Sequence, residues 1–268
     1  MSKSLASPQQ QKVATPQEQA QQPGFRQKAG NAAQQEALAA AKDAQDAAKG
    51  GAESAVGKQN AEDQGPAPIH ITANAFEKQG LRAGVLEKAL TAFRTAWARG
   101  DTDKTIFSII DFSLPSDQKR LWVIDLDSGK LLHHELVTHG SGTGSRMATK
   151  FSNVEGSNQS SLGLSRTAET YESAKFGGTA LRIDGLERGF NDNMRSRAVV
   201  MHQADYATPA AIEANRKAGE SRLGRSQGCP ALDPKVAGAV IKTIKNGTLI
   251  FSYYPDPTWM SRSRYLNP

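Results

Sequence analysis

Four apolar residues share one face of a helix that the sequence predicts between residues 67 and 104. They recur at i, i+4, i+7 and i+11, close to the period of an α-helix: Leu86, Leu90, Phe93 and Trp97. The pattern stops near Gly100. Because such an apolar face is normally buried, we expect this helix to pack as an N-terminal extension against the domain that follows.

Beyond residue 104 the pattern changes to that of short strands. Residues 105–112 and 120–126 are rich in β-branched and aromatic side chains, and a turn at 127–129 precedes another apolar run, which predicts a hairpin. Four later runs also predict strands: SLGLSRT (161–167), TALRIDG (179–185), RAVVMH (197–202) and TLIFSYY (248–254). Helices are expected at 209–218 and 234–245. Short strands separated by Gly-containing turns indicate a mainly β domain over residues 105–268.

Residues 1–66 have a different composition. They are rich in Gln, Ala, Lys and Gly, and Phe25 is their only aromatic residue. Such a segment cannot bury enough apolar surface to offset its conformational entropy. We therefore predict a disordered low-complexity tail, with a transient Ala-rich helix over residues 31–49. Its simplest role is a spacer; a tether, or a tail for secretion or partner binding, is the alternative.

The net charge of +6 belongs entirely to the part of the chain after residue 66, since the tail carries seven basic and seven acidic residues. No Lys/Arg run or aromatic-interleaved basic stripe indicates nucleic-acid binding. A mildly basic surface suits an anionic cell wall. No stretch approaches the ~20 apolar residues of a transmembrane helix. Residues 1–11 lack the apolar segment of a secretory signal, which leaves open a different start, a signal-independent secretion system or a cytoplasmic protein.

The candidate chemistry lies between residues 199 and 232. This stretch holds His202 at the exit of a predicted strand and Cys229, the only cysteine, in a Gly-containing turn. A lone cysteine cannot form an intrachain disulfide, so it is a candidate nucleophile with the histidine as its base. Asp233 and Pro234 look like the N-cap and first-turn proline of a helix. We expect Cys229 on a tight turn entering that helix, where N–H groups and the helix dipole favour the thiolate. The alternative is an inert core cysteine, and its polar flanking residues argue against it.

This segment resembles a known family. His202 followed by SQGC (226–229) is similar to the active-site signature of the YkuD-type L,D-transpeptidases, and Pro230 after the cysteine is typical of their murein L,D-transpeptidase catalytic domain subgroup. Residues 137–144, 151–171 and 181–192 also resemble that subgroup, so the resemblance covers roughly residues 105–255. It implies a β-sandwich-like catalytic fold. Two positions depart from the commoner pattern, which has histidine at Gln227 and arginine at Ala231.

The resemblance and the local chemistry together imply two groups of site residues. The catalytic group comprises the nucleophile, its base, a residue that orients the imidazole and a backbone donor to the oxyanion: Cys229, His202, Ser226 and Gly228. A backbone carbonyl could orient the imidazole instead of the serine. The substrate-binding group comprises a Gly-rich loop, one wall of the cleft and cations for carboxylates: His139, Gly140, Ser161, Arg195, Arg197, Arg225 and Gln227. For any single arginine, a surface salt bridge is the simpler interpretation.

The implied function is a peptidoglycan L,D-transpeptidase that acts on tetrapeptide stem peptides through a thioester, in the cell envelope, as a monomer. The chemistry requires no cofactor and no metal. His133 and His134 are adjacent and would point to opposite faces of a strand, a poor geometry for joint metal ligation. Two alternatives stay open. One is an L,D-carboxypeptidase with the same nucleophile, which could act as a secreted antibacterial effector. The other is a non-catalytic wall-binding module, which Gln227 and Ala231 favour.

Overall fold

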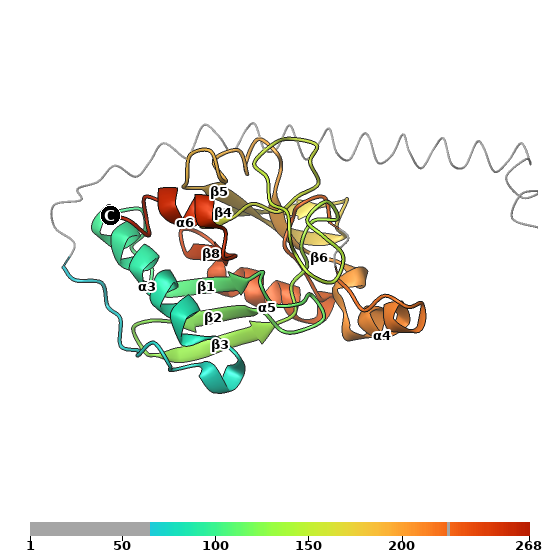
Figure 1. The fold of residues 1–268 in the computed structure, drawn as a ribbon, viewed down its shortest axis with the longest axis horizontal. Helices are drawn as coiled ribbons and strands as arrows, with labels where there is room; N and C mark the ends of the chain where they lie inside the picture. The colour runs from blue at the N-terminus through green and yellow to red at the C-terminus, as the bar shows by residue number, and fades with distance from the viewer. Residues whose placement is uncertain (1–64, 224–225) are drawn as a thin grey trace, which may run out of the picture. The chain divides into compact units, whose positions relative to one another are not determined.

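The computed structural model describes residues 65–223 and 226–268 (Figure 1). All of them belong to one of the two units into which the chain divides. The tail predicted for residues 1–66 lies outside the described residues except for its last two positions, and the helix expected at 31–49 lies outside them entirely. Arg225 also lies outside them.

One eight-stranded sheet organises the described residues, with the strand order β3-β2-β1-β8-β4-β5-β6-β7. The prediction of a mainly β domain is confirmed. The strands are β1 (Ile106–Asp111), β2 (Leu121–Asp125), β3 (Lys130–Glu135), β4 (Gly163–Ser173), β5 (Gly178–Gly185), β6 (Val200–Gln203), β7 (Ala231–Leu232) and β8 (Leu249–Tyr253).

The pairing follows the predicted hairpin and adds one long-range connection. β1 pairs with β2, and β2 with β3, both antiparallel; the turn at 127–129 connects β2 to β3. β8 inserts parallel to β1 and antiparallel to β4, so it joins the first half of the sheet to the second. β4 is longer than predicted and forms a second hairpin with β5. The two-residue strand β7 was not predicted, because so short an element leaves no periodic pattern.

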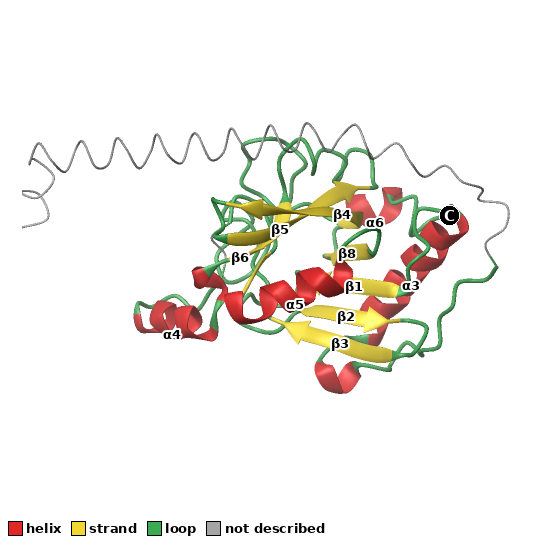
Figure 2. Ribbon diagram, turned by 180° about the vertical axis from the view of Figure 1, so that it is seen from behind, coloured by secondary structure: helices red, strands yellow, loops and turns green. Residues whose placement is uncertain are grey.

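Four α-helices surround the sheet in the described part of the chain: α3 (Ala83–Ala98), α4 (Pro209–Lys217), α5 (Pro234–Ile244) and α6 (Pro257–Arg262). Two short 3₁₀-helices, η1 (Glu77–Gln79) and η2 (Asp205–Ala207), complete the structure. α3 and α5 cover opposite faces of β1 and its neighbours (Figures 1 and 2). α5 contacts β1 and also β5 and β6, which is possible because the sheet curves until it is nearly closed. Among the described residues, no helix has both the length and the apolarity to cross a membrane.

The predicted helix is confirmed as α3, and its apolar face lies in the main core. Leu86, Leu90 and Phe93 are buried, and the Phe93 ring lies 5.2 Å from that of Phe107 on β1. Each such side chain contributes roughly 1.5–3 kcal/mol through burial. Trp97, at the end of the face, is only half-buried and donates from its indole N–H to Gly65 O. α3 therefore shares one core with the sheet.

Candidate active site

Strand pairing brings the segments that carry Cys229 and His202 together. β6 and β7 are parallel neighbours, with His202 opposite Ala231, two residues after the cysteine. The His202 N–H donates to Pro230 O over 3.4 Å. The thiol lies against the same strand, because the Val200 N–H contacts Sγ at 3.5 Å. Val200 and His202 are two residues apart on β6, so their side chains share one face of the strand.

The imidazole of His202 is held in one tautomer. Nδ1 lies 2.7 Å from Gln203 O and must donate to it, since a carbonyl only accepts. The neutral ring therefore presents an unprotonated Nε2. The residue is 2% exposed, and the ring of Phe176 stacks on it with centroids 3.6 Å apart. Burial, helped by the positive charge of Lys175, lowers the pKa of His202 to about 4, so the imidazole is neutral at pH 7. The oriented nitrogen has the form that a general base needs.

The thiol of Cys229 lies in an apolar cluster with Ala180 and Val200, against which Phe176 packs. Burial raises the pKa of Cys229, although the Val200 N–H and two nearby cations oppose that effect. The expectation of a thiolate at a helix N-terminus is wrong for this structure, because β7 separates the cysteine from α5. The expected cap itself is present: the Asp233 carboxylate accepts from Lys235 N, 2.9 Å away. The argument that polar flanking residues keep the thiol out of an apolar site is also wrong.

The Gly-rich loop around residues 138–141 clamps the backbone of the cysteine loop. Thr138 Oγ1 donates to Cys229 O over 3.4 Å and accepts from Ala231 N over 3.0 Å. Ser141 N donates to Ser226 O over 2.7 Å. These bonds on both sides of the cysteine fix the path of its backbone. Thr138 was not predicted as a site residue, because its role depends on a contact between segments about 90 positions apart.

Gly140 and Gly228 allow the Gly-rich loop, the segment 158–160 and the cysteine loop to approach one another closely. A Cβ on Gly140 would lie 2.2 Å from Asn158 O, and Gly228 has φ +116° with Gln159 O 2.7 Å from its Cβ position. Ser160 joins the segments, since its Oγ accepts from Gly140 N over 3.0 Å and donates to Gly228 O over 3.1 Å. Neither position tolerates a side chain without movement of the backbone.

His139 faces the protein interior. Its ring is fully buried, with Arg120 Nη2 2.8 Å from Nδ1 and Gly144 O 3.1 Å from Nε2. A guanidinium only donates, so Nδ1 accepts and Nε2–H donates to the carbonyl. Burial, together with the charge of Arg120, lowers the pKa of His139 to about 4. Both ring nitrogens are used, which makes His139 a support of the Gly-rich loop.

Arg120 is the partner that the sequence did not indicate. It is completely buried, and its guanidinium also donates to Val137 O and Leu114 O, over distances of 2.9–3.1 Å. Burial lowers the pKa of Arg120 to about 9. The cation holds the end of the first hairpin and the start of the Gly-rich loop together.

The two described arginines expected to bind carboxylates are engaged by the protein itself. Arg197 donates from Nη1 to Ser161 Oγ (2.7 Å) and from Nη2 to Gln159 O (2.7 Å), with further bonds to residues 152 and 157. Arg195 forms ion pairs with Asp184 and with Glu169 (3.0 Å). For Arg195, the salt-bridge interpretation therefore describes the structure.

The remaining predicted residues lie along the cysteine loop and the wall beside it. Ser226 Oγ accepts from Gly228 N over 3.3 Å, and the carbonyl of Gln203, not this serine, orients the imidazole. Gln227 is exposed. Ser161 is 6% exposed and donates to Ser152 O.

A family model described as "L,D-transpeptidase catalytic domain" matches residues 77–253 of this chain. The chain belongs to this family. The match includes α3, both halves of the sheet and the segment from His202 to Cys229.

Solved structures of L,D-transpeptidases resemble the chain at low identity. One from Mycobacterium smegmatis is 13% identical, with 56% of this chain and 59% of that chain covered and a TM-score of 0.35. One from Mycobacterium tuberculosis is 15% identical, covers 56% and 58%, and has a TM-score of 0.35. One from Stackebrandtia nassauensis is 14% identical, covers 64% and 67%, and has a TM-score of 0.33. The chain thus spans about 59% of the length of the first of these structures. No curated protein matches the chain.

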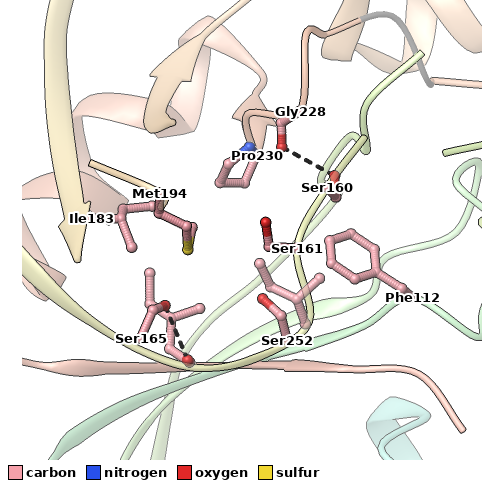
Figure 3. A pocket seen from close by; sticks show the side chains of 11 residues that line it. Phe112, Ser160, Ser161, Ser165, Ile183, Met194, Gly228, Pro230 and Ser252 are labelled. Atoms are coloured by element: carbon pink, nitrogen blue, oxygen red, sulfur yellow. Dashed lines mark hydrogen bonds between the residues drawn. The ribbon is translucent and has the colours of Figure 1, made fainter. Parts of the chain in front are cut away.

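A small pocket lies behind the cysteine loop of this L,D-transpeptidase domain (Figure 3). Its lining combines serines with apolar side chains from both halves of the sheet: Ile110, Phe112, Ser160, Ser161, Ser165, Ile183, Met194, Gly228, Pro230, Ile250 and Ser252. It adjoins the Ser160–Gly228 hydrogen bond, and its lining within the described residues does not include Cys229 or His202. The pocket therefore contacts the residues on either side of the cysteine but is not lined by its sulfur.

The histidines of β3 turn to different partners. His133 Nε2 lies 2.9 Å from Thr243 Oγ1 on α5, whereas the His134 ring stacks on Trp122 with centroids 5.0 Å apart. Within residues 65–223 and 226–268, no group of three or more His, Cys, Asp or Glu side chains is arranged to hold a metal ion.

Proposed function

We propose that this chain is a cysteine-dependent peptidoglycan L,D-transpeptidase that acts on tetrapeptide stems through a thioester acyl-enzyme. The observation that carries the proposal is the pairing of β6 with the cysteine loop, which sets the only thiol of the chain against the strand that bears an oriented imidazole. Membership of the L,D-transpeptidase catalytic domain family supports the same reaction class. A substrate in the wall implies a location in the cell envelope.

In the proposed acylation, His202 Nε2 accepts the proton of the Cys229 thiol as Sγ attacks the carbonyl carbon of the third residue of the stem. The C–N bond to the terminal residue then breaks, and His202 returns its proton to the leaving amine. The products are a thioester on Cys229 and a free amino acid. The backbone N–H groups of Gly228 and Cys229 would hold the oxyanion, the former by exchanging its 3.3 Å bond to Ser226 Oγ.

The starting state of this reaction is a neutral Cys229 thiol, which contacts Val200 N and Ala198 O on the strand side of the loop, and a neutral His202 imidazole. Burial raises the pKa of Cys229 and lowers that of His202, so the protein does not hold a thiolate–imidazolium pair. Proton transfer therefore accompanies attack. We expect the substrate to displace Phe176, which stacks on His202 and packs against the cluster that includes Cys229.

An amine or water could complete the cycle. Attack by an amine on the thioester gives a new peptide bond, either a crosslink to another stem or an exchange with a free amino acid. Attack by water gives an L,D-carboxypeptidase. Product analysis on muropeptides separates these outcomes, because new dimers indicate transpeptidation and tripeptides alone indicate hydrolysis.

The burial of Cys229 favours a second candidate, a non-catalytic wall-binding module. The residue is 8% exposed, and its side chain lies among apolar side chains. Muropeptide analysis distinguishes the candidates, because a buried and protonated thiol reacts slowly with iodoacetamide in either case: a Cys229→Ala variant that leaves muropeptides unchanged relative to the unmodified protein would support the module.

The direct test is mass spectrometry of the protein incubated with a tetrapeptide muropeptide. We expect an adduct of the tripeptide acyl group on Cys229, absent from Cys229→Ala and strongly reduced in His202→Gln. Cys229→Ser is the matched control, since it keeps the size of the side chain and removes the thiol. Release of the terminal amino acid by Cys229→Ala at the rate of the unmodified protein would contradict the assignment of the nucleophile.

A further inference from the structure

The tip of the β4–β5 hairpin covers the candidate site. It comprises residues 174–177, between the last residue of β4 and the first residue of β5. The Gln203 side chain, next to the candidate base, fixes the tip by donating from Nε2 to Phe176 O (3.2 Å) and to Gly177 O (2.8 Å). The tip is therefore tied to the strand that carries His202.

One ring at this tip contacts both an ammonium and the candidate base. Phe176 stacks on His202, packs on the cluster that includes Cys229, and lies 5.6 Å from Lys175 Nζ. The charge of Lys175 acts on both reactive groups, since it adds to the effect of burial that lowers the pKa of His202 and partly opposes the effect of burial that raises the pKa of Cys229. Lys175 is thus the only cation of the hairpin tip, and its ammonium lies next to the ring that stacks on His202.

The other described cations around the site already have partners. The guanidinium of Arg197 donates four hydrogen bonds to residues 152–161. Arg195 is paired with Asp184 and Glu169, and Arg182 with Glu169. Lys175, by contrast, is exposed and forms no ion pair among the described residues. Its ammonium is therefore available to an anion brought by a ligand.

We propose that Lys175 is a specificity-determining residue that binds the terminal carboxylate of the donor stem, on the amino acid that leaves. This assignment rests on the proposed function. In such a substrate only the amide nitrogen and one Cα separate the scissile carbonyl from the terminal carboxylate. The Lys175 ammonium lies 5.6 Å from the ring that stacks on His202, and we infer that it can reach that carboxylate when the carbonyl is at Sγ. A charge-assisted hydrogen bond between them would favour stems that end one residue after the acyl donor.

The test compares three donor stems on the full chain, all with a diamino acid that carries a side-chain carboxylate as the third residue. They are a tetrapeptide with a free terminal carboxylate, its C-terminal amide, and the tetrapeptide amidated only on that side-chain carboxylate. The rate of release of the terminal amino acid, or of its amide, gives kcat/KM for each. For the unmodified protein we expect the C-terminal amide to be roughly tenfold poorer, as loss of one charged hydrogen bond implies. In Lys175→Met that ratio should fall to near one, through a loss on the free acid alone.

Lys175→Arg should keep most of the discrimination, because it keeps the charge. Lys130→Met, an exposed lysine on β3 at the other end of the sheet, should behave as the unmodified protein. An unchanged acid-to-amide ratio in Lys175→Met overturns the proposal, as does a Lys175-dependent preference for the side-chain carboxylate of the third residue. An unmodified protein that acylates Cys229 without discriminating acid from amide overturns the role of Lys175 but not the proposed function. A protein that forms no thioester with any stem overturns both.

Discussion

Replacing Gly228 by alanine tests how closely the backbone segments behind the candidate nucleophile are packed. The position has φ +116°, a conformation that L-residues rarely adopt, and a Cβ there would lie 2.7 Å from Gln159 O. Neither the cysteine loop at Gly228 nor the backbone at Gln159 can easily move to relieve this contact. Gly228 O accepts from Ser160 Oγ, and the Arg197 guanidinium holds Gln159 O at 2.7 Å.

The expected loss of stability has two parts. Backbone strain at this φ costs about 1–3 kcal/mol, and relief of the clash with a fixed carbonyl costs about 1–3 kcal/mol more, as for other overpacked sites. The variant Gly228→Ala should therefore lose about 2–6 kcal/mol of the free energy of unfolding. Displacement of the loop should also abolish acylation of Cys229.

Two matched glycine variants separate the contributions. Gly189 has φ +83° with open space at its Cβ position, so Gly189→Ala should show only the backbone strain. Gly238 lies within α5 with open space at its Cβ position, so Gly238→Ala should be neutral or stabilising by about 0.5–1 kcal/mol. Urea unfolding followed by circular dichroism measures all three. A loss in Gly228→Ala no larger than that in Gly189→Ala would refute the argument from close packing.

Three further predictions concern the buried histidines, the ring of Phe176 and the guanidinium of Arg197. Because burial lowers the pKa of His139 and His202 from 6.5 to about 4, the unfolded chain binds more protons below pH 6.5, so their contribution to stability is present above pH 6.5 and falls as pH drops toward 4. The two groups together contribute a slope of up to about 2.7 kcal/mol per pH unit in the free energy of unfolding, and urea titrations at pH 7, 6 and 5 that give equal stabilities would contradict this. Phe176→Ala should expose the imidazole and the thiol, raise the pKa of His202 toward 6.5 and speed alkylation of Cys229 by iodoacetamide; an unchanged alkylation rate across pH 5–9 would show that the ring does not cover the site. Arg197→Lys should cost about 2–4 kcal/mol in urea unfolding, because an ammonium cannot satisfy four oxygens in the positions set by a guanidinium, and a loss below about 0.5 kcal/mol would mean that these bonds contribute little.

The sequence by itself determined the local elements. A 3.6-residue period located α3, and the turn chemistry at residues 127–129 located the first hairpin. Asp233 and Pro234 located the start of α5. Caps, turns and periodic faces depend on residues close together in the chain, so their physics can be read without the fold. The presence of a single cysteine also pointed to the candidate nucleophile before any contact was known.

Only the tertiary structure decided what surrounds those residues. Burial of the Cys229 thiol, the stacking of Phe176 on His202 and the use of both His139 nitrogens all arise between segments distant in sequence. The arginines expected to bind substrate carboxylates show the same dependence on the fold. A guanidinium binds whichever oxygens the fold places beside it, and for Arg197 these oxygens belong to the protein. Desolvation and hydrogen-bond partners are properties of position in space, which the order of residues specifies only through the complete fold.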